Sequence, residues 1–137
     1  MRFLVYTMEK SIACTKAKSG KEKFNLLIDF DNFQMKKSAS MSTSKYTLDI
    51  MQNHYPERMN RAFIMKPPTA FRMFWSLIKP FVDPVTKTKI VFCSREGSEL
   101  LKIADASNLE PRAFGTGTDL RDFDPNEYLR LPFEVSF

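Results

Sequence analysis

Apolar residues along the chain alternate between two patterns. Short apolar runs within residues 24–30, 60–66 and 86–93 are flanked by turn-forming residues, which is typical of buried parallel strands. Helical spacing of apolar residues predicts helices over residues 3–16, 46–55, 69–82 and 96–106, with a loop over 36–44. Strands that alternate with helices predict an α/β fold, with helices packed on a mainly parallel β-sheet floor.

The predicted helix 69–82 is apolar around most of its girth. Pro67 and Pro68 end the preceding strand, and Thr69 is a suitable N-cap. The exceptions to its apolar character form one stripe: Arg72, Ser76 and Lys79. Burial in a core explains such a helix, and so does a mobile lid over an apolar ligand.

The composition and the apolar segments indicate what kind of protein this is and where in the cell it works. The 13 Phe suit either an ordinary core or a wide apolar cavity. Residues 70–82 are interrupted by charges and a proline, so we expect no transmembrane span, and Glu9-Lys10 comes too early for a signal peptide. Cys14 and Cys93 lack metal-ligand spacing and read as free thiols. We therefore expect a cytoplasmic protein.

Charge is unevenly placed along the chain. The net charge is +5, with the basic excess before residue 105 and an acidic stretch after it. Residues 118–137 are predicted to form an irregular acidic tail. The basic part suits an anionic membrane surface or a nucleic acid, but scattered lysines more often serve solubility.

Asp29 and Asp31 follow the first predicted strand and suggest an alternative function. Two carboxylates at a strand end could bind Mg²⁺ in a metal-dependent phosphatase or nuclease. Such a site needs further acids at later strand ends, and none follows residue 65 or residue 92 directly. The only histidine is His54, and the sequence has no G-x-S-x-G nucleophile elbow with which it could form a catalytic triad. We expect no enzyme, no metal and no cofactor, with Asp29 and Asp31 capping the strand end.

The segment Tyr55-Pro56-Glu57-Arg58 places opposite charges beside a buried strand. Pro56 ends the preceding helix. The charged pair could form an internal salt bridge, or Arg58 could present its guanidinium to a phosphate.

Several segments together resemble the CRAL-TRIO lipid-binding and lipid-transfer family. They are residues 54–64, Pro68, Phe71 and Trp75, and residues 78–90. The resemblance implies a parallel-stranded floor, a deep apolar pocket and a mobile gate helix. It implies binding and intermembrane transfer of a hydrophobic ligand, such as the phospholipid phosphatidylinositol, by a peripherally membrane-associated monomer that binds no nucleic acid.

The resemblance also assigns residues. In phosphatidylinositol-transfer members the headgroup contacts correspond here to Glu57, Arg58, Thr86 and Lys89. The gate and acyl pocket correspond to Phe71, Phe74, Trp75, Ile78 and Phe81.

Two departures from the family pattern bear on function. Residues 1–137 correspond to the lipid-binding lobe, and we expect the N-terminal helical lobe and the first strand to be missing. The family's leucine-proline and paired-glycine stretch is altered over residues 109–117. A partial domain that acts as an interaction module is therefore a further alternative.

Overall fold

The structure is a computed structural model that describes residues 2–15, 20–118 and 126. Almost all of the predicted acidic tail, residues 118–137, lies outside the described residues. The helices are α1 (Arg2–Ala13), α2 (Met41–His54), α3 (Thr69–Ile78), α4 (Pro84–Lys89) and α5 (Ser98–Leu101). Short 3₁₀ turns follow α3 and α5. No helix in the described part is long and apolar enough to cross a membrane.

Three parallel strands form the sheet, which confirms the α/β prediction. They are β1 (Phe24–Asp29), β2 (Met59–Met65) and β3 (Ile90–Phe92), in the spatial order β1-β2-β3. Leu27 pairs with Phe63, and Ile64 pairs with both Ile28 and Phe92. The helices α2 and α3 provide the long crossovers that parallel strands require.

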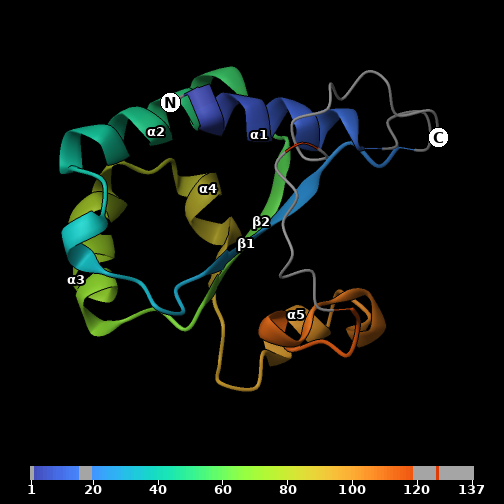
Figure 1. Ribbon diagram of the computed structural model, residues 1–137. Coiled ribbons are helices and arrows are strands. Elements are labelled where there is room, and N and C mark those ends of the chain that lie inside the picture. The colour runs from blue at the N-terminus through green and yellow to red at the C-terminus, as the bar shows by residue number, and fades with distance from the viewer. Residues whose placement is uncertain (1, 16–19, 119–125, 127–137) are drawn as a thin grey trace.

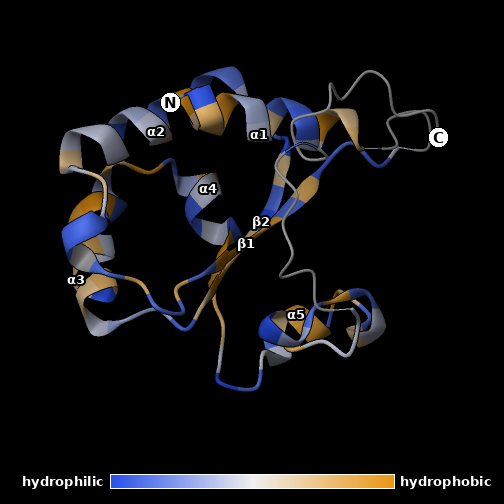
Figure 2. Cartoon of the chain, viewed as in Figure 1, coloured by the Kyte–Doolittle hydropathy of each residue, from blue (hydrophilic) through white to orange (hydrophobic). Residues whose placement is uncertain are grey.

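The two faces of the sheet are covered differently (Figure 1). The helices α1 to α4 gather on one side, whereas α5 and its following turns lie on the other. Figure 2 shows that apolar residues concentrate on the strands where these two groups meet.

The dense core lies on the α5 side. Phe63 and Met65 of β2 point there and are 0% and 2% exposed. They pack with Cys93, Leu100 and Ala113. Burial, with the charge of Glu99 as a smaller cause, raises the pKa of the Cys93 thiol. Because side chains alternate along a strand, Ala62 and Ile64 face the opposite side, toward α1 to α4.

Local capping moves two boundaries away from the predicted ones. The helix α2 begins at Met41, inside the predicted loop, because Ser40 Oγ accepts a hydrogen bond from Thr43 N at 3.2 Å. Residues 86–89 are predicted as the start of a strand but belong to α4, which spans residues 84–89. The Asp83 carboxylate accepts from the N–H groups of Val85 and Thr86, and Pro84 stands at the first helical position, where its fixed φ suits a helix.

Two predicted helices are shorter than expected. The helix α3 ends at Ile78 because Pro80 has no N–H to continue the ladder, and Lys79–Phe81 tighten into a 3₁₀ turn. Its N-cap is Pro68 rather than Thr69. The predicted helix over 96–106 is reduced to the single turn Ser98–Leu101.

The turn between α2 and β2 holds Glu57 in a left-handed conformation, with φ of 60°. Pro56 precedes it, and Arg58 N donates to Tyr55 O at 3.4 Å. A residue with a Cβ pays about 1–2 kcal/mol for this conformation. At position 57 glycine would therefore be more stable than glutamate. Residues in such strained conformations cluster at functional sites, including those that hold ligands.

We expect Glu57→Gly to raise the free energy of unfolding by about 0.5–1 kcal/mol, measured by urea denaturation. Relief of the left-handed strain should exceed the extra chain entropy of glycine in the unfolded state. Glu57→Gln, which keeps the Cβ, should leave the stability near that of the parent. A glycine variant no more stable than the glutamine variant would show that the turn stores no strain at this residue.

Candidate functional site

A cavity of about 510 Å³ lies between the sheet and the helices α1 to α4. All three strands supply its floor, through Leu26, Ile28, Ala62, Ile64, Ile90 and Phe92. These are the side chains on the face of the sheet opposite the dense core. A space of this size and character belongs to the range of small-molecule and cofactor sites.

The N-terminal helix forms one wall of the cavity. Leu4 and Met8 of α1 line it, and Met8 is only 2% exposed. Tyr55 Oη donates a hydrogen bond to Glu9 Oε1 at 2.7 Å, which ties α1 to the end of α2. Burial, and then the hydrogen bond and charge of Glu9, raise the pKa of Tyr55 to about 12. The phenol therefore stays a donor throughout the physiological pH range.

The helix α3 forms the opposite wall. Its contribution to the lining is Phe71, Trp75 and Ile78, which are three of the five residues predicted for the gate and acyl pocket. The Trp75 and Phe92 rings lie with their centres 6.1 Å apart.

The other two predicted gate residues lie elsewhere. Phe74 lines a neighbouring cavity. Phe81 is 56% exposed, and the ammonium of Lys45 sits 3.9 Å from the centre of its ring. The 3₁₀ turn after Ile78 changes the helical phase, so Phe81 does not join Phe71 and Trp75 on the cavity side.

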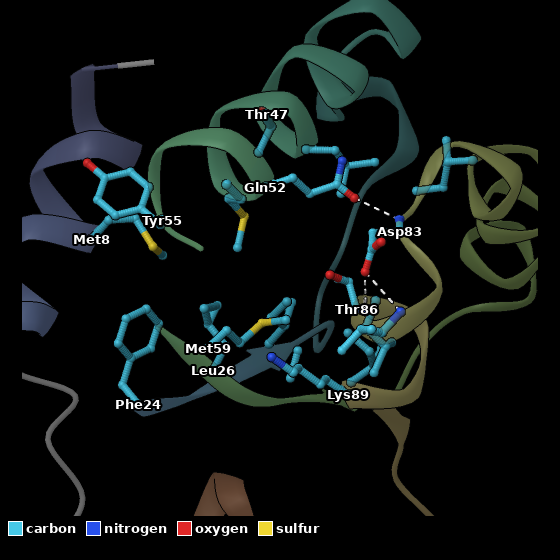
Figure 3. A pocket seen from close by; sticks show the side chains of 18 of the residues that line it. Met8, Phe24, Leu26, Thr47, Gln52, Tyr55, Met59, Asp83, Thr86 and Lys89 are labelled. Atoms are coloured by element: carbon cyan, nitrogen blue, oxygen red, sulfur yellow. Dashed lines mark hydrogen bonds between the residues drawn. The ribbon is translucent and has the colours of Figure 1, made fainter. Parts of the chain in front are cut away.

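Three of the four predicted headgroup residues line the cavity together: Glu57, Thr86 and Lys89. Figure 3 shows the Lys89 side chain extending from α4 into the cavity, close to Thr86. Within the described part of the chain, the side chains of these three residues form no hydrogen bond or ion pair. Their hydrogen-bonding capacity is available to a ligand.

Arg58 departs from its predicted place. It does not line the cavity, and its Nη1 lies 3.7 Å from Glu22 Oε2 in an exposed ion pair. The salt bridge considered between Glu57 and Arg58 is thus replaced by one between Arg58 and Glu22. The left-handed backbone conformation of Glu57 explains why Arg58 lies outside the cavity, because it turns the chain so that the side chains of Glu57 and Arg58 point in different directions.

Sequence reasoning missed two residues at the polar end. Asp83 N donates to Gln52 Oε1 at 2.8 Å, and the Asp83 carboxylate caps α4 (Figure 3). Together they fix α4, and so Thr86 and Lys89, against α2. The Asp-Pro pair is a helix-start signal that could have revealed the cap. No local signal marks Gln52, because its partner is 31 residues away in sequence.

The carboxylate of Asp29 serves the backbone. Its Oδ1 accepts a hydrogen bond from Asp31 N at 3.0 Å and lies 3.8 Å from Lys66 Nζ. The interpretation of Asp29 as a strand-end cap is therefore confirmed. Among the described residues, no group of three acidic, histidine or cysteine side chains is placed to hold a metal ion.

Comparisons with known proteins agree with this arrangement. The chain is 36% identical over 94 residues to the phosphatidylinositol transfer protein PDR17 of Saccharomyces cerevisiae, covering 65% of this chain and 26% of that protein. It is 33% identical over 105 residues to the SEC14 cytosolic factor of Kluyveromyces lactis, covering 75% and 35%. The chain thus spans only about a quarter to a third of the length of these relatives.

The fold also matches a solved structure. The crystal structure of Sfh5 superposes with a TM-score of 0.65 at 24% identity, covering 88% of this chain and 43% of that one. Residues 1–115 match the family described as the CRAL/TRIO domain. The parallel sheet, the apolar cavity and these matches lead to one conclusion: the chain belongs to the CRAL/TRIO domain family.

Proposed function

We propose that this protein binds a phospholipid, phosphatidylinositol in particular, and transfers it between membranes. The observation that carries the proposal is the 510 Å³ apolar cavity, whose lining includes three polar side chains that have no partner among the described residues. An amphiphile fits such a site because its tail replaces water on apolar walls while its headgroup satisfies the polar residues. The names of PDR17 and related proteins, which describe phosphatidylinositol transfer, support the same ligand.

The headgroup is proposed to lie against α4 and the turn after α2. Lys89 supplies positive charge to the phosphate, and Thr86 donates a hydrogen bond from its hydroxyl. Glu57 accepts hydrogen bonds from headgroup hydroxyls. Arg58, held by Glu22 outside the cavity, becomes a headgroup contact only if that exposed ion pair opens.

The helix α3 is proposed to be the gate. Its inner face, with Phe71, Trp75 and Ile78, covers the cavity, and Met73 and Leu77 on its outer face are 69% and 63% exposed. Apolar groups on both faces suit a helix that moves between the protein and a membrane interface. The 3₁₀ turn at Lys79–Phe81 provides a place for the hinge.

The wider setting follows from this activity. We propose a cytoplasmic monomer that touches membrane surfaces transiently, binds no nucleic acid and catalyses no reaction. The excess of basic residues before residue 105 favours contact with anionic lipids. The carboxylate of Asp29, occupied by Asp31 N and Lys66, gives the phosphatase alternative no support.

Lys89→Ala should weaken binding of phosphatidylinositol roughly ten- to hundred-fold, because a hydrogen bond to a charged group contributes about 1.5–3 kcal/mol. Transfer of fluorescent phosphatidylinositol from donor to acceptor vesicles measures the effect. Lys87→Ala is the matched control, since Lys87 lies on the same helix and does not line the cavity. Equal losses in the two variants would mean that general surface charge, and not a headgroup contact, drives binding.

Trp75 reports on the gate because it is the only tryptophan. On addition of vesicles containing phosphatidylinositol, its emission should shift to the blue and become sensitive to quenchers placed within the bilayer, where Trp is favoured at the interface. Quenchers confined to the bilayer separate membrane insertion from mere filling of the cavity. Lipid transfer at the normal rate without any quenching of Trp75 would assign the gate to another element.

A further inference from the structure

The segment that joins α3 to α4 changes from exposed to buried between two adjacent residues. Phe81, the last residue of the 3₁₀ turn, is 56% exposed, whereas Val82 is 2% exposed. Beyond Val82, the N–H group of Asp83 donates to Gln52 Oε1 of α2 at 2.8 Å, and the Asp83 carboxylate caps α4. The chain is therefore held against α2 from Val82 onward, and a moving α3 would pivot just before that residue.

Lys45 of α2 contacts Phe81 on the moving side of this pivot. Its ammonium nitrogen lies 3.9 Å from the centre of the Phe81 ring, well within the roughly 6 Å over which a cation–π contact is attractive. Lys45 and Gln52 are about two helical turns apart, so the same face of α2 makes both contacts. This face therefore anchors the backbone at Asp83 and holds a side chain at Phe81.

The contact between Lys45 and Phe81 is exposed and weak enough to open. Both side chains are accessible to solvent. An exposed cation–π contact shifts an equilibrium by about two- to fivefold. Within the described part of the chain, Lys45 forms no ion pair that would strengthen its hold. Such a contact biases the position of α3 without fixing it permanently.

An anionic membrane surface offers a partner to each half of this pair. Lipid phosphates and other anionic headgroups attract the ammonium of Lys45. The Phe81 ring can enter the apolar part of the interface, together with Leu77 and Val85, which are 63% and 62% exposed. Such a surface binds the separated pair better than the closed pair, and a ligand shifts an equilibrium only through a difference of this kind.

We propose that Lys45 and Phe81 form a latch that keeps α3 closed and that an anionic lipid surface opens. This inference rests on the proposed function, in which α3 is the gate, and it adds lipid charge as the signal that releases the gate. In solution the ammonium rests on the ring and α3 covers the cavity. At an anionic bilayer the ammonium binds lipid headgroups, the ring enters the interface, and α3 pivots before Val82.

The test measures the release of fluorescent phosphatidylinositol from the loaded protein to vesicles of phosphatidylcholine, either alone or mixed with anionic phosphatidylserine. Lys45→Met keeps the length of the side chain without its charge. It should speed release to the neutral vesicles about two- to fivefold, and should reduce the acceleration by phosphatidylserine by the same factor. Phe81→Leu, which removes the ring, should act alike. The double variant should release no faster than either single variant, because each substitution removes the same contact.

Conservative variants and a matched lysine control define the latch. Lys45→Arg and Phe81→Tyr keep the cation and the ring, so both should behave like the parent protein. Lys36→Met removes an exposed lysine outside the latch and should leave release to neutral vesicles unchanged. The latch is wrong if Lys45→Met slows release to anionic vesicles and does not alter release to neutral ones, since that is the effect of general surface charge. Additive effects of Lys45→Met and Phe81→Leu would also contradict it.

A measurement without lipid separates the latch from the proposed function. If the loaded parent protein carries no phosphatidylinositol, the proposed function fails. Quenching of Trp75 by acrylamide still reports the opening of α3, because Trp75 lines the cavity that this helix covers. Stronger quenching in Lys45→Met and in Phe81→Leu than in the parent, with unchanged circular dichroism, would support the latch. Equal quenching in all three proteins would overturn it.

Discussion

The structure depends on a strand that is apolar on both faces. β2 alternates Phe63 and Met65, which enter a dense core, with Ala62 and Ile64, which face the helices α1 to α4. A parallel sheet must have both faces covered. The first face is packed directly by Leu100, Ala113 and the residues around them. On the second face, the helices α1 to α4 leave the cavity of about 510 Å³ between themselves and the sheet.

That void is costly unless something fills it. In the open cavity the apolar walls face water, which costs about 25 cal/mol per Å² of apolar surface left uncovered. An amphiphile that occupies the cavity removes this cost and adds its own apolar burial. Binding and stability are therefore linked, and the same apolar residues serve the fold and the ligand.

The polar end of the cavity is set by backbone chemistry. The Asp83 carboxylate caps α4, and the Asp83 N–H donates a hydrogen bond to Gln52 Oε1. Thr86 and Lys89 are therefore held in place without using their own side chains. On the neighbouring turn, Glu57 is kept in a left-handed conformation beside the cavity. The protein thus orients three polar side chains that form no hydrogen bond with any other residue the structure describes.

The sequence predicts much of this arrangement because its signals are local. Apolar runs place the three strands, and helical spacing places α1, α2 and α3. The resemblance of residues 54–64 and 78–90 to a known family brings Glu57, Thr86 and Lys89 to one site. What it misses depends on distant partners or changes of phase: the Arg58–Glu22 ion pair, the outward turn of Phe81, and the Gln52–Asp83 contact. The sequence does not reveal the short helix α4, because valine and threonine, which make up half of its residues, also favour strands.

The central claim is that a lipid completes the open face of the sheet. Native mass spectrometry of the full chain after incubation with vesicles containing phosphatidylinositol tests it most directly. The account predicts a dominant species heavier than the polypeptide by the mass of one phosphatidylinositol molecule. A protein that emerges from phosphatidylinositol vesicles still as the bare polypeptide, folded and stable, would contradict it.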